Sequence, residues 1–226
     1  RHGGVMSTTW DAGKKPPSAA VTPWRLLLAV IRALILAVMV FGGLAVLLVL
    51  RLVEWPLFGQ HRPLTPYLTQ GVCRAAFVIL GIGFCSHGQA MGHPGAVVAN
   101  HSSWLDIFAL NAGKRIYFVS KSEVAGWPGI GWLARATGTV FIRREPKDAQ
   151  QQKVVFQNRL LAGHRLLFFP EGTSTDGLRV LPFKSTLFAA FFDEKLRCEM
   201  YIQPVTVLYQ PPPGQAAEFY GWWGDM

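Results

Sequence analysis

An uncharged apolar run near the N-terminus constrains the fold of this chain more than any other feature. It occupies residues 33–50, between Arg32 and Arg51. A run of this length reaches the lower limit for a helix that crosses a bilayer core of roughly 30 Å. A cleaved signal peptide is disfavoured, because Arg51 and Leu52 follow at once without a small-residue cleavage site. The run therefore predicts a membrane-embedded helix.

A second apolar stretch, residues 75–84, is too short to span a bilayer alone. The segment between the two, residues 56–66, contains three prolines and a glycine and predicts a turn. Two arrangements fit this pattern: one spanning helix, or a helical hairpin that enters one leaflet and returns. Basic residues occur on both sides of the apolar run, so the positive-inside rule does not choose between them.

The remaining chain has the pattern of an α/β domain. We divide the sequence into a flexible arm (1–20), a membrane-attached helical motif (21–86) and an α/β domain (87–226). Predicted strands are 96–99, 138–142, 165–169 and 201–208, and predicted helices are 103–112 and 147–162. Buried strands separated by helices predict a mostly parallel sheet flanked by helices.

The charge and the cysteines limit the classes of partner. Lys and Arg exceed Asp and Glu by 22 to 13, a formal net charge of +9. Nucleic acid is excluded as the partner because the sequence has no basic stripe or nucleic-acid motif, whereas an anionic membrane surface fits. The three cysteines form neither a CxxC pair nor a cluster with histidine, so we expect no metal site and no disulfide framework.

The string NHSSWLD places a histidine and an aspartate directly after the first predicted strand. His101 lies in the loop and Asp106 lies in the first turns of the following helix, so the carboxylate can fold back to the imidazole. An imidazole held in this way has a fixed tautomer and can act as a general base. The alternative is that His101 and Ser102 cap the helix and that Asp106 favours its positive end.

The string FPEGTS follows the predicted strand 165–169. Pro170 ends the strand, and Gly172 lets the chain turn sharply. Glu171 and Thr173 then project at the same edge of the sheet as His101. A plain turn would explain this string alone, but two polar loops after two buried strands predict one shared site.

A third string, GTVFIRR, ends a predicted strand with Arg143 and Arg144. Two guanidinium groups at a strand end can form a cationic fork for a carboxylate or a phosphate. The alternative is a solvated strand end with surface ion pairs.

Taken together, these strings resemble the lysophosphatidic-acid acyltransferase family of glycerolipid acyltransferases. NHSSWLD is similar to its NHxxxxD block, and GTVFIRR, FPEGTS and YIQPVTV are similar to its second, third and fourth blocks, in the right order. The resemblance covers about residues 75–210. It implies an α/β domain beside a membrane-embedded helical motif, an acyl-carrier-protein or acyl-CoA thioester as donor, and no metal or other cofactor.

The resemblance also implies roles for single residues. His101 would be the base and Asp106 its orienting partner. The residues implied in acceptor binding are Asn100, Arg143, Arg144, Glu171, Gly172, Thr173 and Ser174. Two departures concern the acceptor: Ser174 stands where phosphate-acceptor members usually carry Arg, and Arg143 stands where an acidic residue is more usual. The run EGTSTDGLRVLPFKS is similar to the branch that acylates lyso-aminolipids such as ornithine lipids.

The resemblance thus predicts an O-acyltransferase that acts on the free hydroxyl of a lysolipid, with a lyso-aminolipid of the ornithine or glutamine type as acceptor. The first alternative is a 1-acylglycerol-3-phosphate acyltransferase, and the second is a non-catalytic membrane lipid-binding protein. We expect the inner (cytoplasmic) membrane as location, with the catalytic domain facing the cytoplasm, where the donors are; this favours the hairpin. Family members continue beyond Met226, so we expect an incomplete C-terminus.

Overall fold

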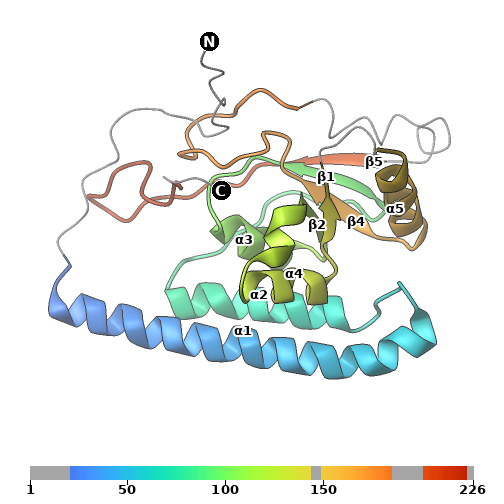
Figure 1. The fold of residues 1–226 in the computed structure, drawn as a ribbon. Helices are drawn as coiled ribbons and strands as arrows, with labels where there is room; N and C mark the ends of the chain where they lie inside the picture. The colour runs from blue at the N-terminus through green and yellow to red at the C-terminus, as the bar shows by residue number, and fades with distance from the viewer. Residues whose placement is uncertain (1–20, 144–148, 185–200, 223–226) are drawn as a thin grey trace, which may run out of the picture.

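Two antiparallel helices form the N-terminal part of the molecule in this computed structural model, which describes residues 21–143, 149–184 and 201–222. Helix α1 (Pro23–Phe58) and helix α2 (Thr65–Leu80) pack side by side and run in opposite directions (Figure 1). The two helices therefore form a hairpin, and the choice between a spanning and a re-entrant arrangement in the membrane stays a prediction. The expected flexible arm, residues 1–20, lies outside the described residues.

Helix α1 has the properties of a membrane helix. Its 36 residues correspond to about 54 Å, longer than a bilayer core of roughly 30 Å. Of its side chains only Leu47 and Glu54 are buried, so most of its apolar surface faces outward. By length and composition it is the one candidate membrane span in the described part of the chain. Apolar surface on this scale marks a region that contacts lipid or a partner.

The predicted turn at residues 56–66 is wrong in its extent. Helix α1 continues through Pro56 as far as Phe58, and Pro66 lies in the first turn of α2. Proline is tolerated in a first turn because its missing N–H would have no intrahelical partner there. The connection is therefore only residues 59–64.

A buried carboxylate holds the two helices together at this connection. Oε1 of Glu54 accepts hydrogen bonds from the backbone N–H groups of Leu64 at 2.6 Å and Thr65 at 2.9 Å. Oε2 accepts one from the Thr65 hydroxyl at 2.8 Å and forms an ion pair with Arg51 at 3.2 Å. These bonds satisfy N–H groups that the start of α2 would otherwise leave unpaired.

The α/β domain is built on a five-stranded sheet in which every neighbouring pair is parallel. The strand order is β3-β2-β4-β1-β5. The strands are β1 (Gly95–Ala99), β2 (Tyr117–Lys121), β3 (Val140–Ile142), β4 (Arg165–Phe168) and β5 (Tyr201–Val205). The predicted fold class is confirmed. The sequence interpretation missed β2, the 3-10 helix η1 (Ser122–Gly126) and helix α4 (Ile130–Thr137).

Helices cover both faces of this sheet (Figure 1). On one face, Leu166 and Phe168 of β4 pack with Phe156 of helix α5 (Ala149–Leu161). On the other face, Leu167 packs with Leu110 of helix α3 (Leu105–Gly113). This alternation is the two-residue period of a strand that is buried on both faces.

The hairpin is attached to the α3 side of the domain. Cys73 and Phe77 of α2 form a buried cluster with Ala112 of α3, and α4 contacts both helices of the hairpin. The helix that follows β1 therefore links the sheet to the apolar helices.

Strands β1 and β4 lie next to each other, with Val98 aligned with Phe168. Because the two strands are parallel, the loops that follow them emerge at the same edge of the sheet. This is the edge at which open α/β sheets place their binding and catalytic residues.

Candidate active site

A histidine and an aspartate form a close pair directly after β1. Nδ1 of His101 lies 2.7 Å from Oδ2 of Asp106. Asp106 is fully buried, and 12% of the His101 side chain is exposed. Because Nδ1 faces the carboxylate it carries the ring proton, which leaves the Nε2 lone pair as the basic site. Nε2 makes no hydrogen bond within the described residues. The predicted pairing of these two residues is present.

The same carboxylate also organises the loop around His101. Oδ2 of Asp106 accepts hydrogen bonds from the backbone N–H groups of Ser102 at 2.7 Å and Ser103 at 3.0 Å. Oδ1 accepts one from the hydroxyl of Tyr209 at 2.6 Å. The capping alternative is thus correct in part, because Asp106 accepts hydrogen bonds from N–H groups just before α3. This alternative does not account for the contact between Asp106 and His101.

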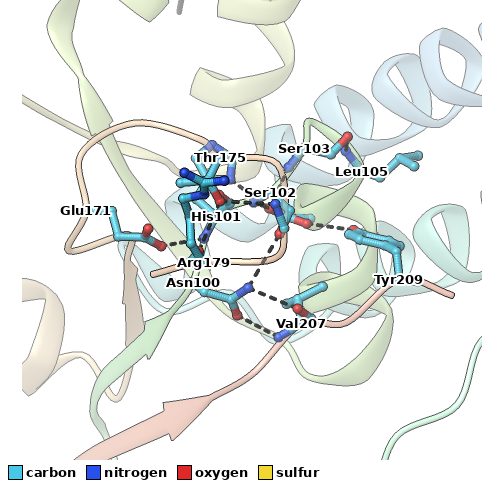
Figure 2. A network of polar contacts seen from close by, with 12 residues as sticks. Asn100, His101, Ser102, Ser103, Leu105, Glu171, Thr175, Arg179, Val207 and Tyr209 are labelled. Carbon is cyan, nitrogen blue, oxygen red and sulfur yellow. Dashed lines mark hydrogen bonds and ion pairs between the residues drawn. The ribbon is translucent and has the colours of Figure 1, made fainter. Parts of the chain in front are cut away.

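The loop after β4 holds the backbone of His101 on both sides (Figure 2). Oε1 of Glu171 accepts the His101 N–H at 3.0 Å, and the Thr175 N–H donates to the His101 carbonyl at 2.9 Å. Oε2 of Glu171 accepts the N–H of Leu181 at 2.7 Å. Glu171 is buried. The structure thus brings Glu171 to His101, with both carboxylate oxygens bound to backbone donors. Direct binding of the lysolipid acceptor by Glu171 stays a prediction, and this geometry does not favour it.

The turn at the centre of this loop has the predicted shape. Gly172 adopts a positive φ of 71°, and its N–H donates to the Phe169 carbonyl at 3.1 Å. An L side chain would strain this conformation, which explains the glycine. Thr173 and Ser174 follow and are both buried. The Ser174 hydroxyl is buried and has no hydrogen-bond partner among the described residues, and its role in acceptor binding stays a prediction.

Asn100 binds the chain that continues from β5. Its Nδ2 donates to the Val207 carbonyl at 3.0 Å, and its Oδ1 accepts the Val207 N–H at 2.8 Å. The amide therefore closes a backbone-like pair across the edge of the sheet (Figure 2). The predicted role of Asn100 in acceptor binding stays a prediction, and the structure shows it in a positioning contact.

The predicted arginine fork lies farther from His101 than the other motif residues. Arg143 is exposed and follows β3, which is three strand positions from β1, or roughly 14 Å. Arg144 lies outside the described residues. Arg143 could contact only a part of the acceptor remote from the reacting hydroxyl, and that contact stays a prediction.

Two aromatic residues at the site escaped the sequence interpretation. The ring of Phe169 stacks on the His101 ring, with centroids 3.9 Å apart and planes 14° apart. Tyr209 reaches Asp106 from 103 positions away in the sequence. Burial, and then the adjacent Asp106 charge, raise the pKa of Tyr209, so its hydroxyl stays protonated as a donor. Phe169 lies in the FPEGTS string, whereas no local signal marked Tyr209.

A small cavity occurs elsewhere, at the opposite edge of the sheet. Its lining includes Arg62, Thr65, Asn111, Tyr117 and Thr137. Its lining contains no acid–base pair comparable to His101 and Asp106, so the carboxyl edge is our candidate site. Among the described residues, no group of three or more His, Cys, Asp or Glu side chains is placed to hold a metal ion.

The molecule is thus a parallel α/β domain with a close His–Asp pair at the carboxyl edge of its sheet, attached to an apolar helical hairpin that contains one candidate membrane span among the described residues. Residues 84–208 match the family described as Acyltransferase, and the chain belongs to this family. The protein is therefore an acyltransferase, and the family predicted from the motifs is confirmed.

Proteins with two different descriptions are similar to this chain. The chain is 55% identical over 217 residues to a lyso-ornithine lipid O-acyltransferase of Rhodobacter capsulatus, covering 96% of this chain and 79% of that one. A protein of the same description from Brucella abortus is 40% identical over 148 residues, or 60% and 54% of the two chains. A 1-acyl-sn-glycerol-3-phosphate acyltransferase of Neisseria gonorrhoeae is 38% identical over 123 residues, or 53% and 48%.

The fold has a counterpart among solved structures. The crystal structure of the 1-acyl-sn-glycerophosphate (LPA) acyltransferase, PlsC, from Thermotoga maritima matches with a TM-score of 0.55 at 22% identity. The match covers 80% of this chain and 81% of that one. The similarity supports the arrangement of the hairpin and the sheet described above.

Proposed function

We propose that this acyltransferase transfers a fatty acyl chain from a thioester donor to the free hydroxyl of a lyso-ornithine lipid. The observation that carries the reaction type is the contact between His101 and Asp106, which leaves Nε2 of the imidazole free to accept a proton. The acceptor is supported by the relative from Rhodobacter capsulatus, which is similar over nearly the whole of this chain.

The reaction needs only a base and a good leaving group. Nε2 of His101 takes the proton of the lysolipid hydroxyl while the oxygen attacks the thioester carbonyl carbon. Asp106 stabilises the imidazolium that forms. The carbon–sulfur bond then breaks, the leaving thiolate takes up the proton, and an ester and a free thiol result. No acyl-enzyme is required.

The oxyanion formed during this attack needs hydrogen-bond donors. The N–H groups of Ser102 and Ser103 are bound to Asp106, and that of Thr175 is bound to His101. The N–H groups of Thr173 and Ser174 make no hydrogen bond within the described residues. These two groups are therefore our candidates for the oxyanion donors.

The loop residue Ser174 favours an aminolipid acceptor over a lysophosphatidate. An ornithine head group carries a single carboxylate, whereas a phosphate monoester approaches two negative charges near neutral pH. A serine in place of the usual arginine removes one positive charge from the loop beside His101. This loss weakens the binding of a phosphate, with nearly two negative charges, more than the binding of a single carboxylate. The second candidate is 1-acylglycerol-3-phosphate, supported by the relative from Neisseria gonorrhoeae.

We place the reaction at the cytoplasmic face of the inner membrane. The expected donors, acyl carrier protein and acyl-CoA, are cytoplasmic thioesters, and we expect no further cofactor. Helix α1 would hold the protein in the bilayer from which the lysolipid acceptor is delivered.

A competition assay tests the acceptor. The membrane-embedded protein is incubated with equal amounts of lyso-ornithine lipid and lysophosphatidic acid and one labelled acyl thioester, with the His101→Ala variant as background. We expect ornithine lipid as the main product. A preference of tenfold or more for lysophosphatidic acid would show that the acceptor is wrong while the enzyme class stands.

A further inference from the structure

Tyr209 binds the side of the Asp106 carboxylate that faces away from His101. Its hydroxyl donates to Oδ1 at 2.6 Å, whereas Oδ2 is shared by His101 and the two serine N–H groups. No other group binds Oδ1 among the described residues. Because Asp106 is fully buried, water cannot replace this hydrogen bond from the surface.

The position of Tyr209 is fixed by contacts on both sides. Two residues earlier, the backbone of Val207 forms its paired hydrogen bonds with the amide of Asn100. The Tyr209 ring packs against the Tyr220 ring, with centroids 5.5 Å apart. The chain that continues from β5 thus brings the Tyr209 hydroxyl to Oδ1 of Asp106.

We propose that Tyr209 is a positioning residue for acyl transfer, which acts on His101 through Asp106. This inference rests on the proposed role of His101 as the base. The hydroxyl prevents the carboxylate from turning about its Cβ–Cγ bond, and so keeps Oδ2 aimed at Nδ1 of the imidazole.

This constraint predicts a distinctive result for Tyr209→Phe. A carboxylate that can turn supports the imidazolium less well in the transition state, so kcat/KM on its plateau should fall about tenfold or more. The protonated imidazole of the free enzyme loses the same support, so it gives up its proton more readily. The acid limb of the kcat/KM profile should therefore move to lower pH, by about half a unit or more.

Tyr220→Phe is the matched control. It removes a hydroxyl from the neighbouring ring, and that hydroxyl makes no hydrogen bond within the described residues. The kcat/KM profile of Tyr220→Phe should have the same plateau and the same acid limb as that of the wild type. The inference is overturned if Tyr209→Phe behaves like this control. It is also overturned if the plateau falls while the acid limb stays in place, since the hydroxyl would then support only the fold.

A double-mutant cycle gives a second and independent measurement. If Tyr209 acts through Asp106, adding Tyr209→Phe to Asp106→Asn should lower the remaining activity by less than about twofold. A further tenfold loss, as large as in the wild-type background, would contradict the inference. Failure of the proposed function gives a different result in the same assay, namely a His101→Ala variant that stays active.

Discussion

The backbone N–H of His101 lies 3.0 Å from Oε1 of Glu171, and this hydrogen bond joins two loops that are 70 residues apart in the sequence. The second oxygen of Glu171 holds the N–H of Leu181. A buried carboxylate with both oxygens bound to backbone donors fixes the chain around it. Glu171 therefore sets the position of His101, because neither of its oxygens is left to face the solvent side of the site.

The Glu171→Gln variant tests this interpretation. A glutamine keeps one acceptor oxygen but turns its NH₂ toward one backbone N–H, so a buried hydrogen bond is lost at a cost of about 1–3 kcal/mol of folding free energy. We expect a lower melting temperature and a fall in kcat that exceeds any rise in the acceptor KM. Glu123→Gln, at an exposed carboxylate in η1, is the control and should change neither. A raised KM with an unchanged kcat would instead assign Glu171 to acceptor binding.

The Ser174→Ala variant separates acceptor binding from folding. The Ser174 hydroxyl has no partner among the described residues, so its removal should leave the melting temperature unchanged. If the hydroxyl binds the acceptor, KM should rise roughly fivefold while kcat stays constant, as a neutral hydrogen bond of about 1 kcal/mol requires. Ser103→Ala is the contrast, because the Ser103 hydroxyl accepts the Leu105 N–H and its loss should lower stability. An unchanged KM in Ser174→Ala would remove this residue from the acceptor site.

A buried histidine should make the stability of the protein depend on pH. Burial first, and then the nearby guanidinium groups of Arg159 and Arg62, lower the pKa of His164 to about 3. In the unfolded chain this pKa is about 6.5, so between these values the unfolded state binds the extra proton. Stability is therefore complete above about pH 6.5 and falls as the pH is lowered toward 3, by up to about 1.4 kcal/mol per pH unit.

Thermal denaturation between pH 7 and pH 5 measures this effect. We expect the melting temperature to fall with pH in the wild type and to fall less steeply in His164→Phe, which keeps an aromatic ring against Tyr117. His93→Phe, at an exposed histidine whose ring stacks on Tyr201, should retain the wild-type slope. Equal slopes in the wild type and His164→Phe would contradict the expectation.

The sequence predicted those parts of the fold that depend on local composition. The apolar run in α1 and the short apolar strands β1 and β4 are visible because burial on all sides selects continuous apolar residues. Strand β2 was missed because the segment YFVSK mixes polar and apolar residues, and most of it is only half-buried. Pro56 misled the turn prediction because α1 continues through it to Phe58. A proline inside a helix removes one backbone hydrogen bond but does not always end the helix.

The site could be predicted as far as its motifs extend. His101 and Asp106 are only five residues apart, so the short loop that leads into α3 is enough to bring them together. The contacts of Asn100 with Val207 and of Asp106 with Tyr209 span more than 100 residues. They follow from the parallel strand order, which places the end of β5 beside β1, and no local pattern encodes that order.

Acyl transfer by the His101→Ala variant tests the central claim most directly. The membrane-embedded wild type and the variant are incubated with lyso-ornithine lipid and a labelled acyl thioester, and Asp106→Asn is measured alongside. General-base catalysis contributes roughly 10²–10⁴-fold, so we predict that His101→Ala loses at least about a hundredfold of the transfer rate with an unchanged melting temperature, and that Asp106→Asn loses much of it as well. A folded His101→Ala variant that keeps more than about a tenth of the wild-type rate would contradict the account.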